Sequence, residues 1–175
     1  MEFLSERNVE LHREYLNNLI LKYRIFEKSY PELVGVRLPE IHKAKIPYYE
    51  RDEAEKLLSE IEAHKIFFSS FGKRNLRCER IKREFGSESQ FLYQLLTECI
   101  KADSGFLLIY EDNGKISFYI GTEYGKILKH KRVKLALDLC EHAYFYDYGF
   151  NRDSYIWAAI SFFDFDNIEK SDDRC

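Results

Sequence analysis

FLLIYEDNGKISFYIG, residues 106–121, is the stretch that decides how the chain folds. Two β-rich runs, Phe106–Glu111 and Lys115–Gly121, flank the dipeptide Asn113-Gly114. Asn-Gly between such runs is a strong signal for a tight hairpin turn, because both residues tolerate a positive φ. The stretch therefore predicts an antiparallel β-hairpin. The short run Val133–Ala136 is a candidate third strand.

Two long helices are predicted before this hairpin. In residues 5–28 the apolar side chains recur at spacings of three, four or seven, and Ser5 is a suitable N-cap. A second apolar stripe covers residues 51–72, where Gly72 ends the helix. All three prolines of the chain fall within residues 31–50, which predicts a long connection with little regular structure.

Further helices are predicted around the hairpin. Ser87 and Gln90 have the spacing of a capping box, which opens a helix over residues 88–102. Helical residues follow near 140–146 and again near 153–162. The C-terminal part of the chain therefore mixes helices with strands.

This order of elements predicts an α+β fold. We expect an N-terminal long helical hairpin, residues 1–84, packed on a C-terminal α/β domain, residues 85–175, with a small antiparallel three-stranded sheet. A chain of 175 residues has the length of one domain, or of two small subdomains that share a core.

Charge and composition argue against several classes of protein. The chain has 27 basic and 30 acidic residues and a formal net charge of −3, which gives no reason to expect a nucleic acid or a membrane surface as partner. No apolar run reaches the roughly 20 residues that span a bilayer, and the charged start has no signal-peptide core. The four cysteines lie far apart, which disfavours a disulfide framework or a zinc ribbon. We therefore expect a cytoplasmic protein.

A few residues could carry chemistry. Asp138 and His142 would share one face of a helix and could bind one metal ion, although an ordinary ion pair is the simpler interpretation of that spacing. His12 and His64 lie in the apolar stripes of the two long helices, where a histidine is more often a core residue than a ligand. Cys140 beside His142 leaves a Cys–His nucleophile pair open. The residues alone indicate a possible His/Asp metal site.

Residues 138–148, DLCEHAYFYDY, closely resemble the D-x-W-E-H-A-Y motif of the iron/manganese superoxide dismutases. Several motifs in one order are much more specific than one, and they cover nearly the whole chain except the proline-rich connection. The resemblance implies a helical hairpin plus an α+β domain, the architecture predicted above. The further matches lie, in the family's order, at Tyr15–Leu19, Ala63–Phe68, Arg83–Ser87, Asp103–Phe106 and Asn151–Tyr155.

The resemblance implies one iron or manganese ion per chain, held by three histidines and one aspartate. His64, Asp138 and His142 fall on three of these ligand positions. We take His12 as the fourth, because the segment SERNVELH that ends at His12 matches the segment leading to the family's first ligand. The other possible alignment makes His12 a later histidine and puts the ligand position near Arg7, whose protonated guanidinium has no lone pair to offer.

Three further residues match catalytic positions of the family. Tyr15 matches the gateway tyrosine, and Arg152 matches a basic residue of the substrate funnel. Glu60, four residues before His64, stands where many iron forms have a glutamine. The amide of glutamine can donate a hydrogen bond toward metal-bound water, whereas an ionised carboxylate can only accept one. We expect Glu60 to point toward the metal.

By this resemblance the chain is a superoxide dismutase, which converts superoxide to oxygen and hydrogen peroxide as a homodimer bridged near Glu141 and Tyr144. The alternative is a catalytically inactive superoxide dismutase fold with an assembly or binding role, which Glu60 and the replacement of a family tryptophan by Cys140 favour. A third possibility is another metal-dependent redox or hydrolytic activity with the same ligands. The resemblance leaves the choice between iron and manganese open.

Overall fold

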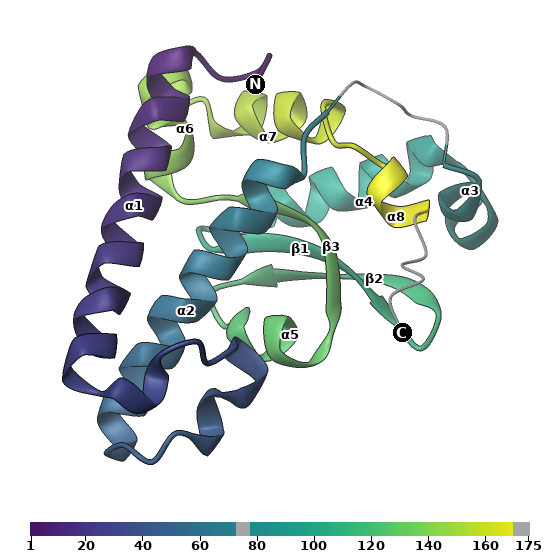
Figure 1. The fold of residues 1–175 in the computed structure, drawn as a ribbon. Helices are drawn as coiled ribbons and strands as arrows, with labels where there is room; N and C mark the ends of the chain where they lie inside the picture. Colours follow the sequence, from purple (N-terminus) through teal and green to yellow (C-terminus); the bar gives the residue numbers. More distant parts are fainter. Residues whose placement is uncertain (73–77, 170–175) are drawn as a thin grey trace.

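The computed structural model describes residues 1–72 and 78–169, and its first feature is a long antiparallel pair of helices (Figure 1). Helix α1 spans Glu6–Ser29 and helix α2 spans Tyr48–Ser69. Ser5 caps α1, because its side chain accepts a hydrogen bond from the backbone N–H of Asn8. The predicted first helix and its cap are confirmed.

Helix α2 begins and ends three residues earlier than the predicted 51–72. It starts directly after Pro47, whose carbonyl accepts the first helical hydrogen bond from Arg51. After Ser70 the chain leaves the helix, because Phe71 forms an isolated β-bridge with Phe163. A long-range backbone pairing, which local sequence does not reveal, therefore sets the end of α2.

The proline-rich connection is more regular than predicted. It contains two short 3-10 helices, Pro31–Leu33 and Leu38–Lys43. Leu33 and Ile41 from these helices are fully buried, and they pack into a small core between α1 and α2. The connection thus closes the lower end of the hairpin in Figure 1.

The sheet has the strand order β2-β1-β3 and is antiparallel throughout. Strand β1 spans Phe106–Asp112, β2 spans Lys115–Gly121 and β3 spans Arg132–Asp138. Asn113 and Gly114 have φ values of 50° and 76°, as a two-residue hairpin turn requires. The hairpin and the three-stranded sheet are confirmed, and the third strand is longer than the predicted run at both ends.

Helices complete the C-terminal part of the fold. Ser87 caps α4 by accepting from the backbone N–H of Gln90, as predicted. Helices α3 and α5 were not predicted, since they are short and bury at most one side chain each. The helices of this part are α3 Glu79–Phe85, α4 Glu88–Lys101, α5 Gly125–His130, α6 Glu141–Tyr148, α7 Arg152–Ser161 and α8 Asp166–Glu169.

One main core joins both halves of the chain. Helix α2 contributes Phe67, the sheet contributes Leu107 and Leu137, and α7 contributes Tyr155, and all four are fully buried. This confirms the packing of the helical hairpin on the C-terminal part.

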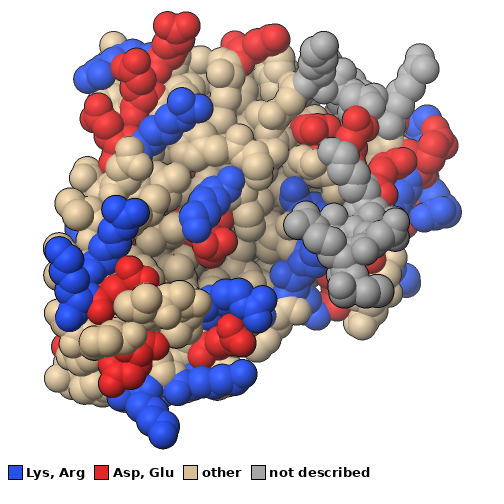
Figure 2. Space-filling model, in the orientation of Figure 1, with Lys and Arg blue, Asp and Glu red and all other residues tan. Residues whose placement is uncertain are grey.

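The surface shows no single-sign field on the face seen in Figure 2, where basic and acidic side chains intermix. Among the described residues, no helix is long and apolar enough to cross a bilayer.

Candidate metal centre

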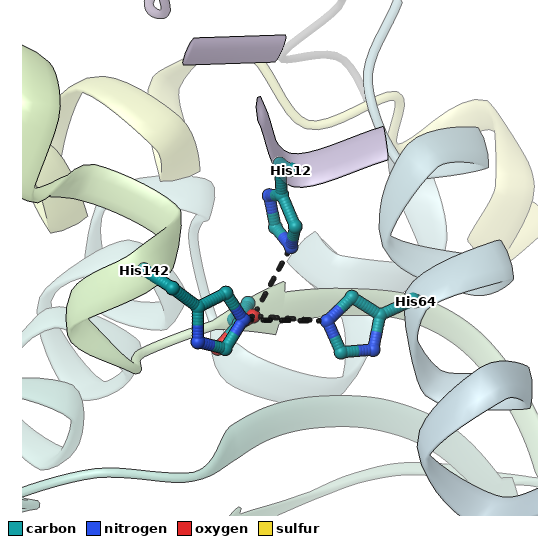
Figure 3. A group of neighbouring side chains, drawn as sticks. His12, His64 and His142 are labelled. Atoms are coloured by element: carbon teal, nitrogen blue, oxygen red, sulfur yellow. Dashed lines mark hydrogen bonds and ion pairs between the residues drawn. The ribbon is translucent and has the colours of Figure 1, made fainter. Parts of the chain in front are cut away.

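Four side chains from four different elements converge at one point of the main core (Figure 3). His12 comes from α1, His64 from α2, Asp138 from the end of β3 and His142 from the first turn of α6. Each offers one ligand atom, and these atoms all lie within 4.8 Å of one another. The structure thus brings together all four residues that the resemblance assigns to the metal.

The Asp138 carboxylate lies at the centre of this group. Its Oδ2 atom is 3.2 Å from Nε2 of His12, 3.4 Å from Nε2 of His64 and 2.8 Å from Nε2 of His142. His12, His64 and Asp138 are at most 1% exposed, whereas the side chain of His142 is 31% exposed. The cluster is therefore buried on three sides, and His142 forms the side that faces solvent.

Local backbone structure fixes the position of Asp138. The register of β1 and β3 pairs Asp138 with Phe106 at the end of the sheet. Asp138 Oδ1 accepts from the backbone N–H of Cys140 at 2.9 Å, and Cys140 is the residue that precedes α6. The hydroxyl of Tyr155, fully buried on α7, donates to the Asp138 carbonyl at 2.7 Å. Sequence analysis missed this role of Tyr155, whose only signal was its place in a family motif.

The histidines of the two long helices are held in different ways. His64 Nδ1 lies 2.7 Å from the carbonyl of Glu60, so Nδ1 carries the proton and Nε2 presents its lone pair to the cluster. His12 makes no such contact, and its ring lies against Phe67 and Phe68 with centroid separations of 4.6 and 5.2 Å. The apolar residues of the two helices, whose pattern suggested that both histidines belong to the core, pack around the two imidazole rings.

The electrostatics of the cluster suit a cation. Burial alone would raise the pKa of the Asp138 carboxyl, but its contacts with His12, His142 and His64 hold that pKa well below the usual range. Burial lowers the pKa of His12 and so favours a neutral imidazole. Burial also acts to lower the pKa of His142, but the neighbouring Asp138 carboxylate outweighs it and raises the pKa. The group therefore has one fixed negative charge and imidazole nitrogens that can act as ligands.

Unpartnered atoms indicate that an ion fits here. Asp138 Oδ2 and both ring nitrogens of His12 are buried without a hydrogen bond of good geometry among the described residues. Buried polar atoms normally have partners, because an unpaired one costs free energy. A metal ion would satisfy them, and three imidazole nitrogens with one carboxylate oxygen suit iron or manganese better than a soft-metal site would.

Tyr15 and Glu60 lie together beside this cluster. The Tyr15 hydroxyl donates to Oε1 of Glu60 at 2.5 Å, and the Tyr15 ring stacks on His142 with a centroid separation of 4.2 Å. Burial, followed by the hydrogen bond to Glu60, raises the pKa of Tyr15. The Glu60 side chain is therefore separated from His142 by one tyrosine.

The side chains of Arg152, Glu141 and Tyr144 lie outside the four-residue cluster. The Arg152 guanidinium donates to the carbonyls of Leu139 and Cys99, at 3.5 and 3.3 Å. Tyr144 is 6% exposed and stacks on a buried tyrosine, while Glu141 is exposed at the start of α6.

Cys140 does not form a nucleophile pair with His142. Its thiol contacts the Ser104 hydroxyl at 3.3 Å and the Gly105 carbonyl at 3.8 Å. Burial, with the nearby Asp138 charge, raises the pKa of Cys140 to about 11, so the thiol stays protonated near neutral pH. The side chain fills space beside the centre rather than supplying an activated thiolate.

Comparison with known protein families adds independent information. A family model described as "Iron/manganese superoxide dismutases, C-terminal domain" matches residues 74–171, more than half of the chain. The matched range contains Asp138 and His142. His12 and His64 precede it in the sequence and lie outside the match. A comparison with curated proteins finds no match.

Proposed function

Because the chain belongs to the iron/manganese superoxide dismutase family, we propose that it converts superoxide to oxygen and hydrogen peroxide at one iron or manganese ion. One observation carries this proposal: three imidazoles and one carboxylate from four elements place their ligand atoms within 4.8 Å of one another. His12, His64, Asp138 and His142 are the residues that would hold the ion. When bound, the ion supplies the one-electron chemistry, since superoxide alternately reduces and reoxidises it.

The rest of the chemistry falls to neighbouring side chains. The partly exposed His142 and the stacked Tyr15 form the side of the cluster from which a small anion can approach. Formation of hydrogen peroxide consumes two protons, and the Tyr15–Glu60 pair holds a hydroxyl proton next to that side. We propose Tyr15 and Glu60 as the groups that orient substrate and protons. Arg152 stays a proposed basic residue of the approach region, on the resemblance alone.

Metal analysis paired with a dismutation assay tests this function. We expect the purified protein to contain about one iron or manganese ion per chain and to dismute superoxide, and we expect removal of the metal to abolish the activity. Protein reconstituted separately with each metal shows which one supports turnover. A chain that binds neither metal would contradict the proposal.

The alternative is a metal-binding but catalytically silent member of the family. The Tyr15–Glu60 hydrogen bond favours the silent alternative. The Tyr15 hydroxyl donates its single proton to Glu60, so it has no proton to donate toward a substrate. A carboxylate at position 60 can only accept hydrogen bonds, whereas the amide of the glutamine found in many iron forms can also donate one. Full metal occupancy without dismutation would select this alternative.

The substitution Glu60→Gln tests whether the carboxylate at this position limits the dismutase activity. We expect the substitution to raise dismutase activity, because the amide can accept from Tyr15 and also donate a hydrogen bond. The expected rise is about tenfold, the size of effect that is typical when a residue surrounding the ligands of a metal site is replaced. Activity per bound metal is the measurement. Glu62→Gln is the matched control, since Glu62 lies on the same helix and bonds the exposed Lys65. Equal activity of Glu60→Gln and the unmodified chain would show that no donor is needed at this position.

We also propose a homodimer that joins the two chains through α6 near Glu141 and Tyr144. Exposed aromatic side chains on this part of the surface support it, since Phe145, Tyr146 and Phe150 are 47, 61 and 95% exposed. A two-fold interface uses each residue twice, so Glu141→Ala should shift metal-loaded protein from dimer to monomer in sedimentation velocity. The control Glu123→Ala should leave the dimer intact. A monomer at micromolar concentration without any substitution would refute the interface.

The proposed compartment is the cytosol. Cys78, Cys99 and Cys140 carry free thiols, as is usual where glutathione and thioredoxin keep cysteines reduced.

A further inference from the structure

His12 lacks the hydrogen bond that usually orients a metal-binding histidine. Its Nδ1 atom is buried without a partner among the described residues, whereas Nδ1 of His64 is paired with the Glu60 carbonyl. In metalloproteins the ring nitrogen that faces away from the metal normally makes such a bond, which fixes the direction of the ring. Without such a bond, the position of His12, which faces His142 and His64 in Figure 3, depends on its ring packing against Phe67 and Phe68 and on the placement of α1.

A hydrogen-bond cluster one turn before His12 fixes that placement. The side-chain amide of Asn8 donates to the carbonyl of Ala143 at 3.2 Å and to Oδ2 of Asp147 at 3.1 Å. Asp147 also accepts from the backbone N–H and the hydroxyl of Ser5, at 2.8 and 2.6 Å. Helix α1 is thus tied to α6 through its cap and its first turn.

The geometry connects this cluster to two clustered histidines. Asn8 and His12 are four residues apart on α1 and face the same side, and both are at most 1% exposed. Ala143, which accepts from Asn8, directly follows His142. A shift of α1 along α6 would therefore break the Asn8 bonds and change the separation of His12 and His142 together.

The Asn8 amide is satisfied at its nitrogen and, among the described residues, unpaired at its oxygen. It is fully buried, and its Oδ1 atom has no hydrogen-bond partner in the described part of the chain. An apolar side chain of similar size would remove this unpaired oxygen, but it would also leave the Ala143 carbonyl and Asp147 without their Asn8 donor. Its two directed donor bonds do set where one helix lies on the other.

We propose that Ser5, Asn8 and Asp147 form a positioning cluster that sets His12 against His142 and thereby raises the affinity for the metal without touching it. This inference rests on the proposed function, because it requires the four-residue metal centre. It concerns residues outside the ligand set and outside the Tyr15–Glu60 pair.

The test compares Asn8→Leu and Asn8→Ala with the unmodified chain. We expect both variants to bind Co²⁺ and Mn²⁺ about 10–100-fold more weakly in a competition with a chelator. The visible absorption spectrum of the Co²⁺-loaded protein should change, because the ligand geometry changes. Leucine fills the space of asparagine but removes the two donor bonds to Ala143 and Asp147, so Asn8→Leu should lower the unfolding midpoint of the metal-free protein while leaving it folded. A role in stability alone predicts no loss of affinity in that variant.

Tyr148→Phe is the matched control. The Tyr148 hydroxyl donates to the Phe3 carbonyl at 2.6 Å, so it also ties α6 to the N-terminal segment but lies outside the cluster. We expect this variant to lose stability and to retain both the Co²⁺ spectrum and the metal affinity. If Asn8→Leu binds Co²⁺ with unchanged affinity and spectrum, the positioning role is wrong and the proposed function stands. If the unmodified chain binds no metal, both proposals fail.

Discussion

Protein purified with the substitution Asp138→Ala is expected to contain almost no iron or manganese. Asp138 supplies the only negative charge of the four-residue group, and its Oδ2 atom lies within 3.4 Å of all three imidazoles. Without it, three neutral nitrogens remain, and a hard divalent or trivalent cation binds oxygen ligands preferentially. We expect metal occupancy to fall from about one ion per chain to a trace, with complete loss of dismutation.

Elemental analysis of protein purified in parallel measures this effect. Asp112→Ala is the control, because Asp112 is a partly exposed carboxylate paired with Lys131 at 2.6 Å on the far end of the hairpin. That variant should keep its metal. Thermal unfolding of both metal-free variants shows whether Asp138→Ala is still folded. A folded Asp138→Ala protein that retains stoichiometric metal would overturn the assignment of the metal centre.

Replacing Gly105 with alanine is expected to prevent stable folding. Gly105 has a φ of +102°, and a Cβ atom there would overlap the backbone carbonyl of Gly121 and meet the backbone N of Thr122 at 2.9 Å. The positive φ alone costs other residues about 1–2 kcal/mol, and the overlap with rigid backbone adds to it. Because the Gly105 carbonyl also accepts from the N–H of Leu139 at 2.8 Å, a shift here would move the residue next to Asp138.

The hairpin turn supplies the comparison for this effect. Gly114 has a φ of +76°, but nothing lies within 4 Å of an added Cβ atom. Gly114→Ala should therefore lose only the free energy that the positive φ costs an alanine. We expect the free energy of unfolding, measured with urea, to fall by about 1–2 kcal/mol. Gly105→Ala should give insoluble protein or a far lower urea midpoint. Similar midpoints for the two variants would show that the strand start relaxes around the methyl group.

Elements with strong local signals were predictable from sequence. Asn113-Gly114 fixed the hairpin, and Ser5 and Ser87 marked the starts of α1 and α4, because turns and caps depend on a few adjacent residues. Elements set by distant pairing were not predictable. The end of α2 depends on the bridge between Phe71 and Phe163, and α5 has no buried side chain to create a periodic pattern.

The residues of the candidate site also differ in whether local sequence could predict them. Asp138 and His142 are four residues apart, so sequence could place them on one face, but spacing alone could not tell a metal site from an ion pair. His12 and His64 sit in apolar stripes, where burial hides their chemistry, and only the family resemblance singled them out. Asn8 gave no signal, because its partners on α6 lie more than a hundred residues away along the chain.

The order in which the four clustered residues are synthesised determines when the chain could first bind the proposed metal ion. A ribosome makes α1 and α2 first, and His12 is synthesised 126 residues before Asp138. During translation the nascent hairpin contains two of the four clustered residues, both imidazoles, and lacks the Asp138 carboxylate, which leaves too few ligands to hold a hard cation tightly. The last two proposed ligands are made with β3 and α6, after α1, α2 and the first two strands of the sheet. Capture of the proposed ion is thus deferred until β3 and α6 have been made, and the ion that binds is the one available to a folding chain that already contains them.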